Sequence, residues 1–134
     1  MRRALVPAQV GPPIARYSPG VEVGGPLRWV YVTGQVATDA SGATVGADIA
    51  TQAEQVYRNI TAVLAEAGAQ LGDLVAVTVY LVDRADFPAF TAVRDKVFAE
   101  VSPPSSTVVF VAGLVVPEHL VEISAVAAVP DGPR

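Results

Sequence analysis

The sequence predicts an α+β protein in which a single mixed β-sheet of five to six strands is backed by two helices on one face. The prediction depends on two amphipathic helical stretches and on several apolar segments rich in Val and Ile. These elements follow one another as strands, helix, strand, helix and two further strands. A length of 134 residues is typical of one domain, which we expect to span residues 1–134.

The N-terminal part of the chain contains three candidate strands. Arg3–Val6 suits a short first strand that a proline ends. Gly20–Val23 and Trp29–Thr33 are two further extended segments, and the Gly-Gly-Pro sequence at 24–26 favours a turn between them. We therefore expect these two segments to pair with each other as a hairpin.

Two helices follow, and each has recognisable ends. Asp48 suits the N-cap of the first helix and Gly68 its C-terminal stop. The apolar residues between them recur at three- and four-residue steps, so they form one stripe. Asp86 suits the N-cap of the second helix, whose first turn tolerates Pro88, and Ser102 with the two prolines after it ends that helix.

Three apolar strands complete the predicted sheet. Leu74–Val82 is apolar on both alternating faces, which is typical of a central strand covered on both sides. Ser105–Ala112 and Leu120–Val129 are nearly free of charge, and residues 130–134 form a tail. Two helices cover only one face of such a sheet. We therefore expect further copies of the chain to bury the other face in a homo-oligomer.

Composition excludes several classes of function. The net charge is −4 and no cluster of Lys or Arg follows Arg2 and Arg3, so nucleic-acid binding is not expected. The chain has no cysteine, and its one histidine, His119, has few partners for a metal site or a Ser-His-Asp triad. We expect this loop histidine to be solvated. No apolar run is long enough to span a membrane, so we expect a cytoplasmic protein.

Glu122 is the one ionised side chain in the last predicted strand. Side chains alternate along a strand, so Glu122 shares a face with Ser124 and Val126. A carboxylate in such a strand is costly unless it is paired, hydrogen-bonded or solvated. The residues alone leave open a solvated strand edge, an ion pair and a functional carboxylate.

Several short motifs occur in a recognisable order between Tyr17 and Val129. They are Arg16-Tyr17-Ser18, Gly20-Val21, Val32-Thr33-Gly34-Gln35, the helical segment 52–68, Asp86-Phe87, Pro104, Val109–Leu114 and Val121-Glu122-Ile123. This ordered set resembles the Rid, or YjgF, family of reactive-intermediate deaminases. The resemblance implies a chorismate-mutase-like fold and a homotrimer with small-molecule pockets at the subunit interfaces. It also implies hydrolysis of an enamine or imine to a ketone and ammonia without metal or cofactor.

The resemblance also assigns roles to individual residues. It implies that Glu122 holds the attacking water and that Tyr17 helps to close the pocket. Thr33 stands where the family usually has a serine, and Thr91 where deaminase members commonly have an asparagine. The residues expected to line the substrate pocket are Arg16, Thr33, Gly34, Thr91, Ser106 and Thr107.

Ser106 is the main departure from the family pattern. It stands where the arginine that binds the substrate carboxylate is expected, and residues 103–119 contain no Arg or Lys. A neutral hydroxyl does not replace a charged, bidentate guanidinium. We therefore expect a hydrolytic deaminase whose enamine or imine is not the usual small carboxylate substrate. The alternatives are a different tailoring step on the same trimeric fold and a ligand-binding protein without catalysis.

One variant of this hypothesis keeps a carboxylate substrate but binds it through another arginine. The candidates are Arg16, Arg28 and Arg94. The sequence favours a surface position for each of them, since arginine is rarely buried unless it is paired.

Overall fold

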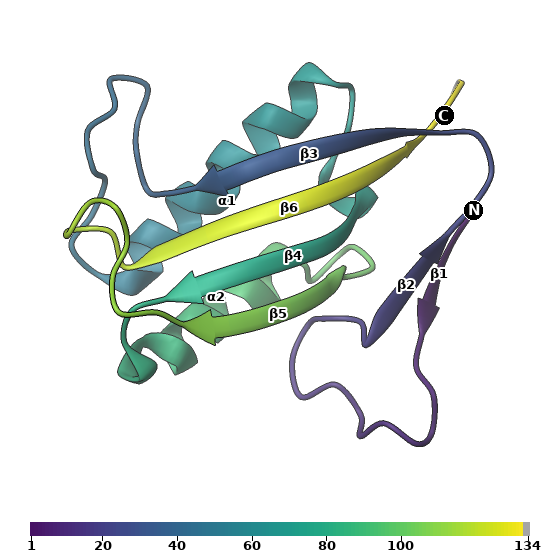
Figure 1. Cartoon of the computed structure of the whole chain (residues 1–134), viewed down its shortest axis with the longest axis horizontal. Helices are drawn as coiled ribbons and strands as arrows, with labels where there is room; N and C mark the ends of the chain where they lie inside the picture. Colours follow the sequence, from purple (N-terminus) through teal and green to yellow (C-terminus); the bar gives the residue numbers. More distant parts are fainter. Residues whose placement is uncertain (133–134) are drawn as a thin grey trace.

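The computed structural model describes residues 1–132 and consists of a β-sheet with two helices packed on one face (Figure 1). The helices are α1 (Ile49–Glu66) and α2 (Phe87–Val97). The last two residues of the predicted tail lie outside the described part. The strands are β1 (Arg2–Leu5), β2 (Gly20–Val23), β3 (Leu27–Gln35), β4 (Leu74–Leu81), β5 (Ser105–Phe110) and β6 (Val121–Pro130).

The main sheet has the strand order β3-β6-β4-β5. β6 pairs antiparallel with both β3 and β4, whereas β4 and β5 pair parallel. The predicted α+β class and the mixed sheet are therefore confirmed. Because β6 and β4 are the two central strands, the strand that carries Glu122 is not an edge strand.

The predicted hairpin between Gly20–Val23 and the following strand is wrong. β2 pairs with β1, and the two form a separate two-stranded sheet beside the main one (Figure 1). The main sheet consequently has four strands rather than five or six. Gly25, at a φ of 92°, turns the chain out of the small sheet. β3 then pairs along β6 from Leu27 to Gln35, and this long pairing over the core replaces the local one.

Both predicted helices are present. Asp48 caps α1 as expected, since its carboxylate accepts hydrogen bonds from the backbone N–H and the hydroxyl of Thr51. Gly68, at a φ of 69°, follows the last turn. α2 begins directly after Asp86, but the side chain of Asp86 makes no capping bond. It ends at Val97 rather than at Ser102.

The hydrophobic core lies between the sheet and the two helices. Its largest fully buried members are Val56, Ile60 and Leu64 of α1, Phe90 of α2, Phe98 just after it, Leu74, Val79 and Leu81 of β4, and Val121, Ile123 and Val129 of β6. The alternate residues of the same strands point to the other face, which none of the described elements covers (Figure 1). None of the described helices has the length and apolarity needed to cross a membrane.

Candidate functional site

Glu122 lies on the uncovered face of the sheet, on central strand β6. In the register it lies opposite Tyr80 of β4, which in turn lies opposite Val109 of β5. The Glu122 side chain is half-buried, and it makes no hydrogen bond or ion pair with any residue of the described range 1–132. Glu122 is therefore not at a sheet edge and is in no ion pair with the described residues, whereas its half-buried carboxylate keeps contact with solvent.

Gly34 makes room for the Glu122 carboxylate. A Cβ at position 34 would overlap Oε2 of Glu122 and would lie 2.7 Å from its Cδ. The register between β3 and β6 shifts between Val32 and Gln35, so one extra residue of β3 is accommodated there. β-Bulges of this kind are common beside active sites, where they redirect a side chain or a backbone group. The carboxylate thus rests against bulged backbone that carries no side chain.

A groove of about 440 Å³ follows the same uncovered face. Its polar rim includes Thr33, Thr78 and Ser124, and Thr107 lies opposite Thr78 on the neighbouring strand. Ser124 is two residues from Glu122, so both side chains point to this face. The structure therefore gathers four of the residues expected from the sequence, Glu122, Thr33, Gly34 and Thr107, on one face of the sheet.

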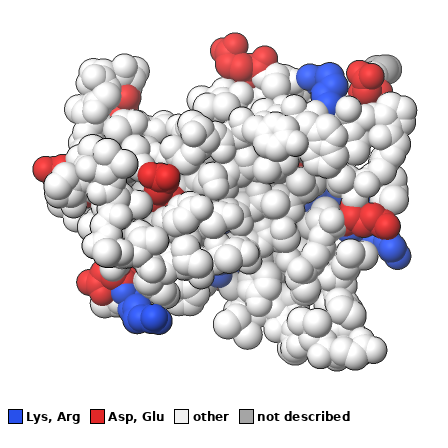
Figure 2. All heavy atoms as spheres, viewed as in Figure 1, with Lys and Arg blue, Asp and Glu red and all other residues white. Residues whose placement is uncertain are grey.

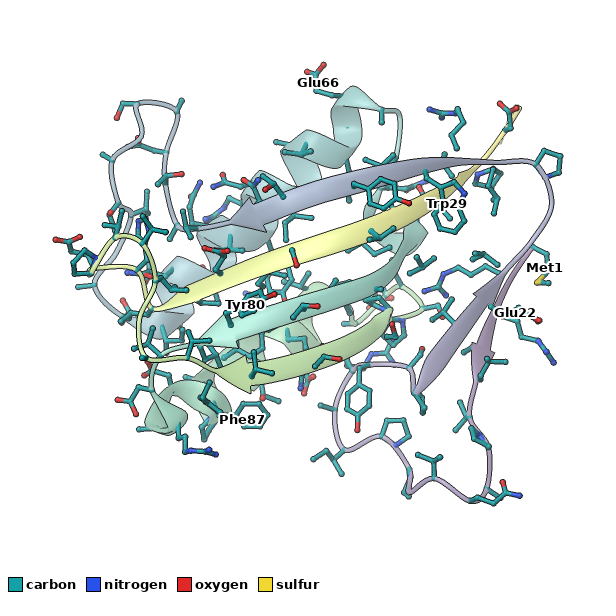
Figure 3. All side chains as sticks on the ribbon, in the orientation of Figure 1. Met1, Glu22, Trp29, Glu66, Tyr80 and Phe87 are labelled. Carbon is teal, nitrogen blue, oxygen red and sulfur yellow. The ribbon has the colours of Figure 1, made fainter. Side chains whose placement is uncertain are left out.

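Two large aromatic side chains of β3 are exposed on this face. Trp29 is 50% exposed and Tyr31 is 76% exposed. Figure 3 shows Trp29 and Tyr80 on the side of the sheet opposite the helices. In Figure 2 the charged groups lie mostly around the margin of this face, and the surface over the strands is largely uncharged. Tyr80, the cross-strand neighbour of Glu122, was not among the residues expected from the sequence, where it reads as one more residue of a buried strand.

Ser106 and Thr91 lie on the other side of the sheet, toward the helices. Ser106 lies opposite Val77, which is only 4% exposed and belongs to the core. The Oγ of Ser106 and the Oγ1 of Thr91 are both buried, and neither has a hydrogen-bond partner among the described residues. The described residues thus leave both hydroxyls without a hydrogen bond.

The segment around Tyr17 is attached to the end of α2 and to the start of β5. The guanidinium of Arg16 donates to the carbonyls of Phe98, at 2.9 Å, and Val101, at 2.8 Å. Ser18 donates its N–H to the carbonyl of Pro104 at 2.9 Å. These bonds fix the backbone on both sides of Tyr17, and they engage the Arg16 guanidinium that was expected to contact substrate.

The other two candidate arginines differ in burial. Arg28 donates to the carbonyl of Ala67 from an exposed position. Arg94 of α2 is only 4% exposed, so the expectation that it is a surface residue is wrong. Its guanidinium carbon lies 5.8 Å from the centre of the Tyr17 ring and 5.6 Å from that of Phe90. Stacking on two aromatic rings lets α2 bury a side chain that periodicity alone places on the surface.

His119 is also buried rather than solvated. It is 4% exposed, and its Nε2 lies 3.1 Å from the hydroxyl of Thr44. The neighbouring backbone groups of Glu118 and Leu120 bond to the side chain of Gln52 on α1. His119 therefore belongs to a polar anchor of its loop. Within residues 1–132, no group of three or more His, Cys, Asp or Glu side chains is arranged to hold a metal ion.

Comparisons with known proteins identify the family. Residues 8–129 match the family model described as Endoribonuclease L-PSP. A crystal structure of YyfB from Yersinia pestis, a member of the conserved Rid protein family, superposes with a TM-score of 0.88 at 33% identity, over 96% of this chain and 98% of that one. The chain belongs to the Rid, or YjgF, family.

Curated Rid relatives cover most of the chain. A RutC family protein of Pyrococcus abyssi is 40% identical over 116 residues, which is 86% of this chain and 87% of the relative. The 2-iminobutanoate/2-iminopropanoate deaminase of Escherichia coli is 34% identical over 94 residues, or 70% of this chain and 68% of that enzyme. The family relationship thus includes proteins named as deaminases of small imino acids.

The expected site residues of this Rid chain form two groups on opposite sides of the sheet. Glu122, Thr33, Gly34 and Thr107 lie on the uncovered face. Ser106, Thr91, Tyr17 and Arg16 lie around β5 and α2 on the helical side. Within a single chain the sheet separates the two groups.

Proposed function

We propose that this chain is a hydrolytic deaminase that converts an enamine or imine to a ketone and ammonia in the cytoplasm. The observation that carries the proposal is the carboxylate of Glu122, which has no partner among residues 1–132 and lies against Gly34 beside a groove of about 440 Å³. A carboxylate engaged in an ion pair would be a poor base, whereas a free one can accept a proton from water. Membership of the Rid family, which includes named imine deaminases, supports the same reaction.

The reaction needs one proton acceptor that later acts as a donor. Glu122 accepts a proton from water while the water oxygen bonds to the imine carbon, and it returns that proton to the imine nitrogen, which gives a neutral carbinolamine. Glu122 then accepts the proton of the carbinolamine hydroxyl and passes it to nitrogen as the C–N bond breaks, so that the carbonyl forms and ammonia leaves. Imine and water are consumed, ketone and ammonia are produced, and no atom is oxidised or reduced. One half-buried carboxylate meets this requirement.

The active unit in this proposal is a homotrimer with its pockets at the subunit interfaces. Glu122 and Gly34 lie on the uncovered face, whereas Tyr17 and Ser106 lie on the helical side. A pocket that contains both groups therefore requires residues of two copies. The exposed aromatic residues of β3 on the uncovered face, with Tyr31 at 76% exposure, support burial of this face by another copy.

The proposal includes a substrate other than the usual small carboxylate. At the position where the guanidinium of an arginine is expected, Ser106 provides one hydroxyl, which has no partner among residues 1–132. The Escherichia coli relative is named for 2-iminobutanoate and 2-iminopropanoate, which carry a carboxylate next to the imine carbon. An imine of that kind would lose its principal charged contact here, so we expect a different substrate to be preferred.

The test compares wild type with Glu122→Gln, using imines generated in the reaction by an amino-acid oxidase from a panel of amino acids. Glu122→Gln keeps the shape of the side chain and removes its basicity, so we expect turnover to fall by about 100-fold or more. Glu66→Gln is the matched control, since Glu66 is exposed at the end of α1 (Figure 3). Light scattering should give about three times 13.9 kDa for all three proteins.

Two results would count against the proposal. Near-wild-type turnover by Glu122→Gln would return Glu122 to a structural role. A wild-type trimer that leaves the whole panel unchanged would favour a ligand-binding protein or a different small-molecule reaction on the same fold.

A further inference from the structure

Arg94 is a buried cation that has no counterion among residues 1–132. The residue is 4% exposed, and its Nε is buried without a hydrogen-bond partner in the same range. The ion pairs among residues 1–132 join Arg3 to Glu22 and Arg58 to Glu54, and neither involves Arg94. A guanidinium stays protonated inside proteins, so burial does not neutralise it as it can neutralise a lysine. Burial of a charge without a partner lowers the stability of the folded protein, and Arg94 has this destabilising effect here.

The neighbouring acidic group is already engaged. Asp95, the next residue of α2, accepts a hydrogen bond from the backbone N–H of Arg16 at 3.0 Å. The contacts of the Arg94 guanidinium carbon are instead with the faces of Tyr17 and Phe90, at 5.8 Å and 5.6 Å from the ring centres. Aromatic faces stabilise a cation without using its N–H donors. The described residues therefore leave the donors of Arg94 without hydrogen bonds.

Unsatisfied hydroxyls occur on the elements around Arg94. Among residues 1–132, five buried side-chain polar atoms have no hydrogen-bond partner, and four of them belong to Tyr57, Thr91, Arg94 and Ser106. Thr91 lies one turn before Arg94 on the same helix, and three-residue spacing places both on one face. Ser106 faces the helical layer from β5.

Tyr57 of α1 completes this set. Burial raises the pKa of the Tyr57 hydroxyl, while the positive charge of Arg94 acts on it in the opposite direction. That hydroxyl consequently stays protonated near neutral pH and remains a donor. One charged donor and three neutral hydroxyls, all buried and without partners in the described part of the chain, are the kinds of group that bind anions.

We propose that Arg94 binds the acid group of the substrate, and that this group is a carboxylate carried away from the imine carbon. The inference rests on the proposed function. The contact expected for a carboxylate on the imine carbon is absent, since Ser106 replaces the arginine of β5. The cation without a partner among residues 1–132 lies instead on α2, a different element, and on this ground the proposal assigns it a different acid group. Arg94 thus selects imines with a distal carboxylate over small 2-imino acids.

Tyr17 controls access to this site. Its ring lies over the guanidinium, and the bonds of Arg16 and Ser18 hold the backbone on both sides of it. In this proposal, a ligand reaches the Arg94 donors when the Tyr17 ring changes rotamer, while the bonds of Arg16 and Ser18 keep the segment in place. Tyr17 therefore covers the anion site when it is empty, and this provides a physical reason for a tyrosine at that position.

The test measures binding of unreactive ketones, so it does not depend on catalysis. The probes are 4-oxopentanoate and its neutral amide, with pyruvate and pyruvamide as the pair whose acid group adjoins the carbonyl. Calorimetry on the intact wild-type protein should show 4-oxopentanoate binding at least about tenfold tighter than its amide, because hydrogen bonds to a charged group are the stronger ones. Pyruvate and pyruvamide should bind with similar, weak affinity.

Arg94→Gln should abolish the preference for the carboxylate, and Arg94→Lys should retain part of it. Arg84→Gln is the control, because Arg84 is exposed before the first turn of α2 and its loss changes the net charge equally. Equal binding of 4-oxopentanoate and its amide by wild type would overturn the proposal without using any variant. A preference that survives in Arg94→Gln would also overturn it, as would an Arg94-dependent preference for pyruvate over pyruvamide.

Loss of the oligomer in Arg94→Gln, together with no preference for 4-oxopentanoate over its amide in wild type and in Arg94→Lys, would assign Arg94 to subunit contacts and would also overturn the proposal. Failure of the proposed function is a separate result. Glu122→Gln tests the chemistry of hydrolysis, whereas the ketone probes report only on recognition of the acid group.

Discussion

Substitution of Gly34 by alanine tests the link between the backbone of β3 and the Glu122 carboxylate. The φ of Gly34 is not in the left-handed region, so alanine is compatible with the backbone. The new Cβ would instead overlap Oε2 of Glu122 and lie 2.7 Å from Cδ and 3.0 Å from Cγ. The substitution therefore acts on the position of the carboxylate while leaving its chemistry intact.

The size of the effect follows from these distances. Carbon atoms in contact prefer about 3.5–4.0 Å, so the carboxylate must move by roughly 1 Å. A displacement of that size at a reacting group costs about 100-fold in rate. The clash involves the free end of a flexible side chain, and alanine reduces the entropy of the unfolded chain by about 0.4–1 kcal/mol. We therefore expect stability to change by no more than about 1 kcal/mol.

The assay measures turnover of enzymatically generated imines together with thermal unfolding. Gly113→Ala is the control, since a Cβ at that position meets no atom within 4 Å. A double-mutant cycle with Glu122→Gln shows whether Gly34→Ala lowers turnover through the Glu122 carboxylate. When two substitutions disturb one contact, their effects on the activation free energy do not add. Gly34→Ala should cost little further activity in the Glu122→Gln background. Wild-type turnover by Gly34→Ala, or a full additive loss in the cycle, would refute the reasoning.

Two further predictions concern Ser106 and Asp48. Wild type should hydrolyse 2-aminoacrylate on the order of 100-fold more slowly than an arginine-bearing relative, and Ser106→Arg should recover part of the rate in a coupled assay. Equal rates of wild type and the relative would contradict this. Hydrogen bonds from the Thr51 backbone and hydroxyl lower the pKa of Asp48, so its stabilisation is present above about pH 4 and is lost on acidification. The melting temperature of Asp48→Asn should therefore lie below that of wild type near neutral pH, and the difference should become smaller below pH 4. A difference that does not change with pH would exclude the ionised Asp48 carboxylate as its cause.

Local sequence signals predicted the helices and the C-terminal strands well. Asp48 and Gly68 mark the limits of α1 because capping and left-handed backbone are properties of a few adjacent residues. The pairing of β2 could not be predicted in the same way. The turn residues before β3 indicate a change of direction, but the partner of each strand depends on contacts between distant segments, here β1 with β2 and β3 with β6.

For the candidate site too, the sequence predicted what depends on adjacent residues and did not predict what depends on distant segments. Glu122 is apparent in the sequence because a single carboxylate interrupts an apolar strand. Tyr80 and Arg94 are not apparent in the sequence. A tyrosine is an ordinary residue of a β-strand, and an arginine is an ordinary residue of the polar side of an amphipathic helix. Their importance depends on what lies across the sheet from Tyr80 and what covers Arg94, and neither is encoded locally.

Glu122 and Arg94 together indicate how the single chain is incomplete. In the part of the chain that the structure describes, the carboxylate on the uncovered face and the guanidinium on the helical side both lack a partner of opposite charge. A fold selected only for stability would pair such charges or replace them with apolar residues, because a buried ion pair is often no more stable than its apolar substitute. Retaining both without partners is consistent with a site in which Glu122 acts on water and Arg94 receives an anion. Copies packed through the uncovered face would then bring the two functions to one pocket.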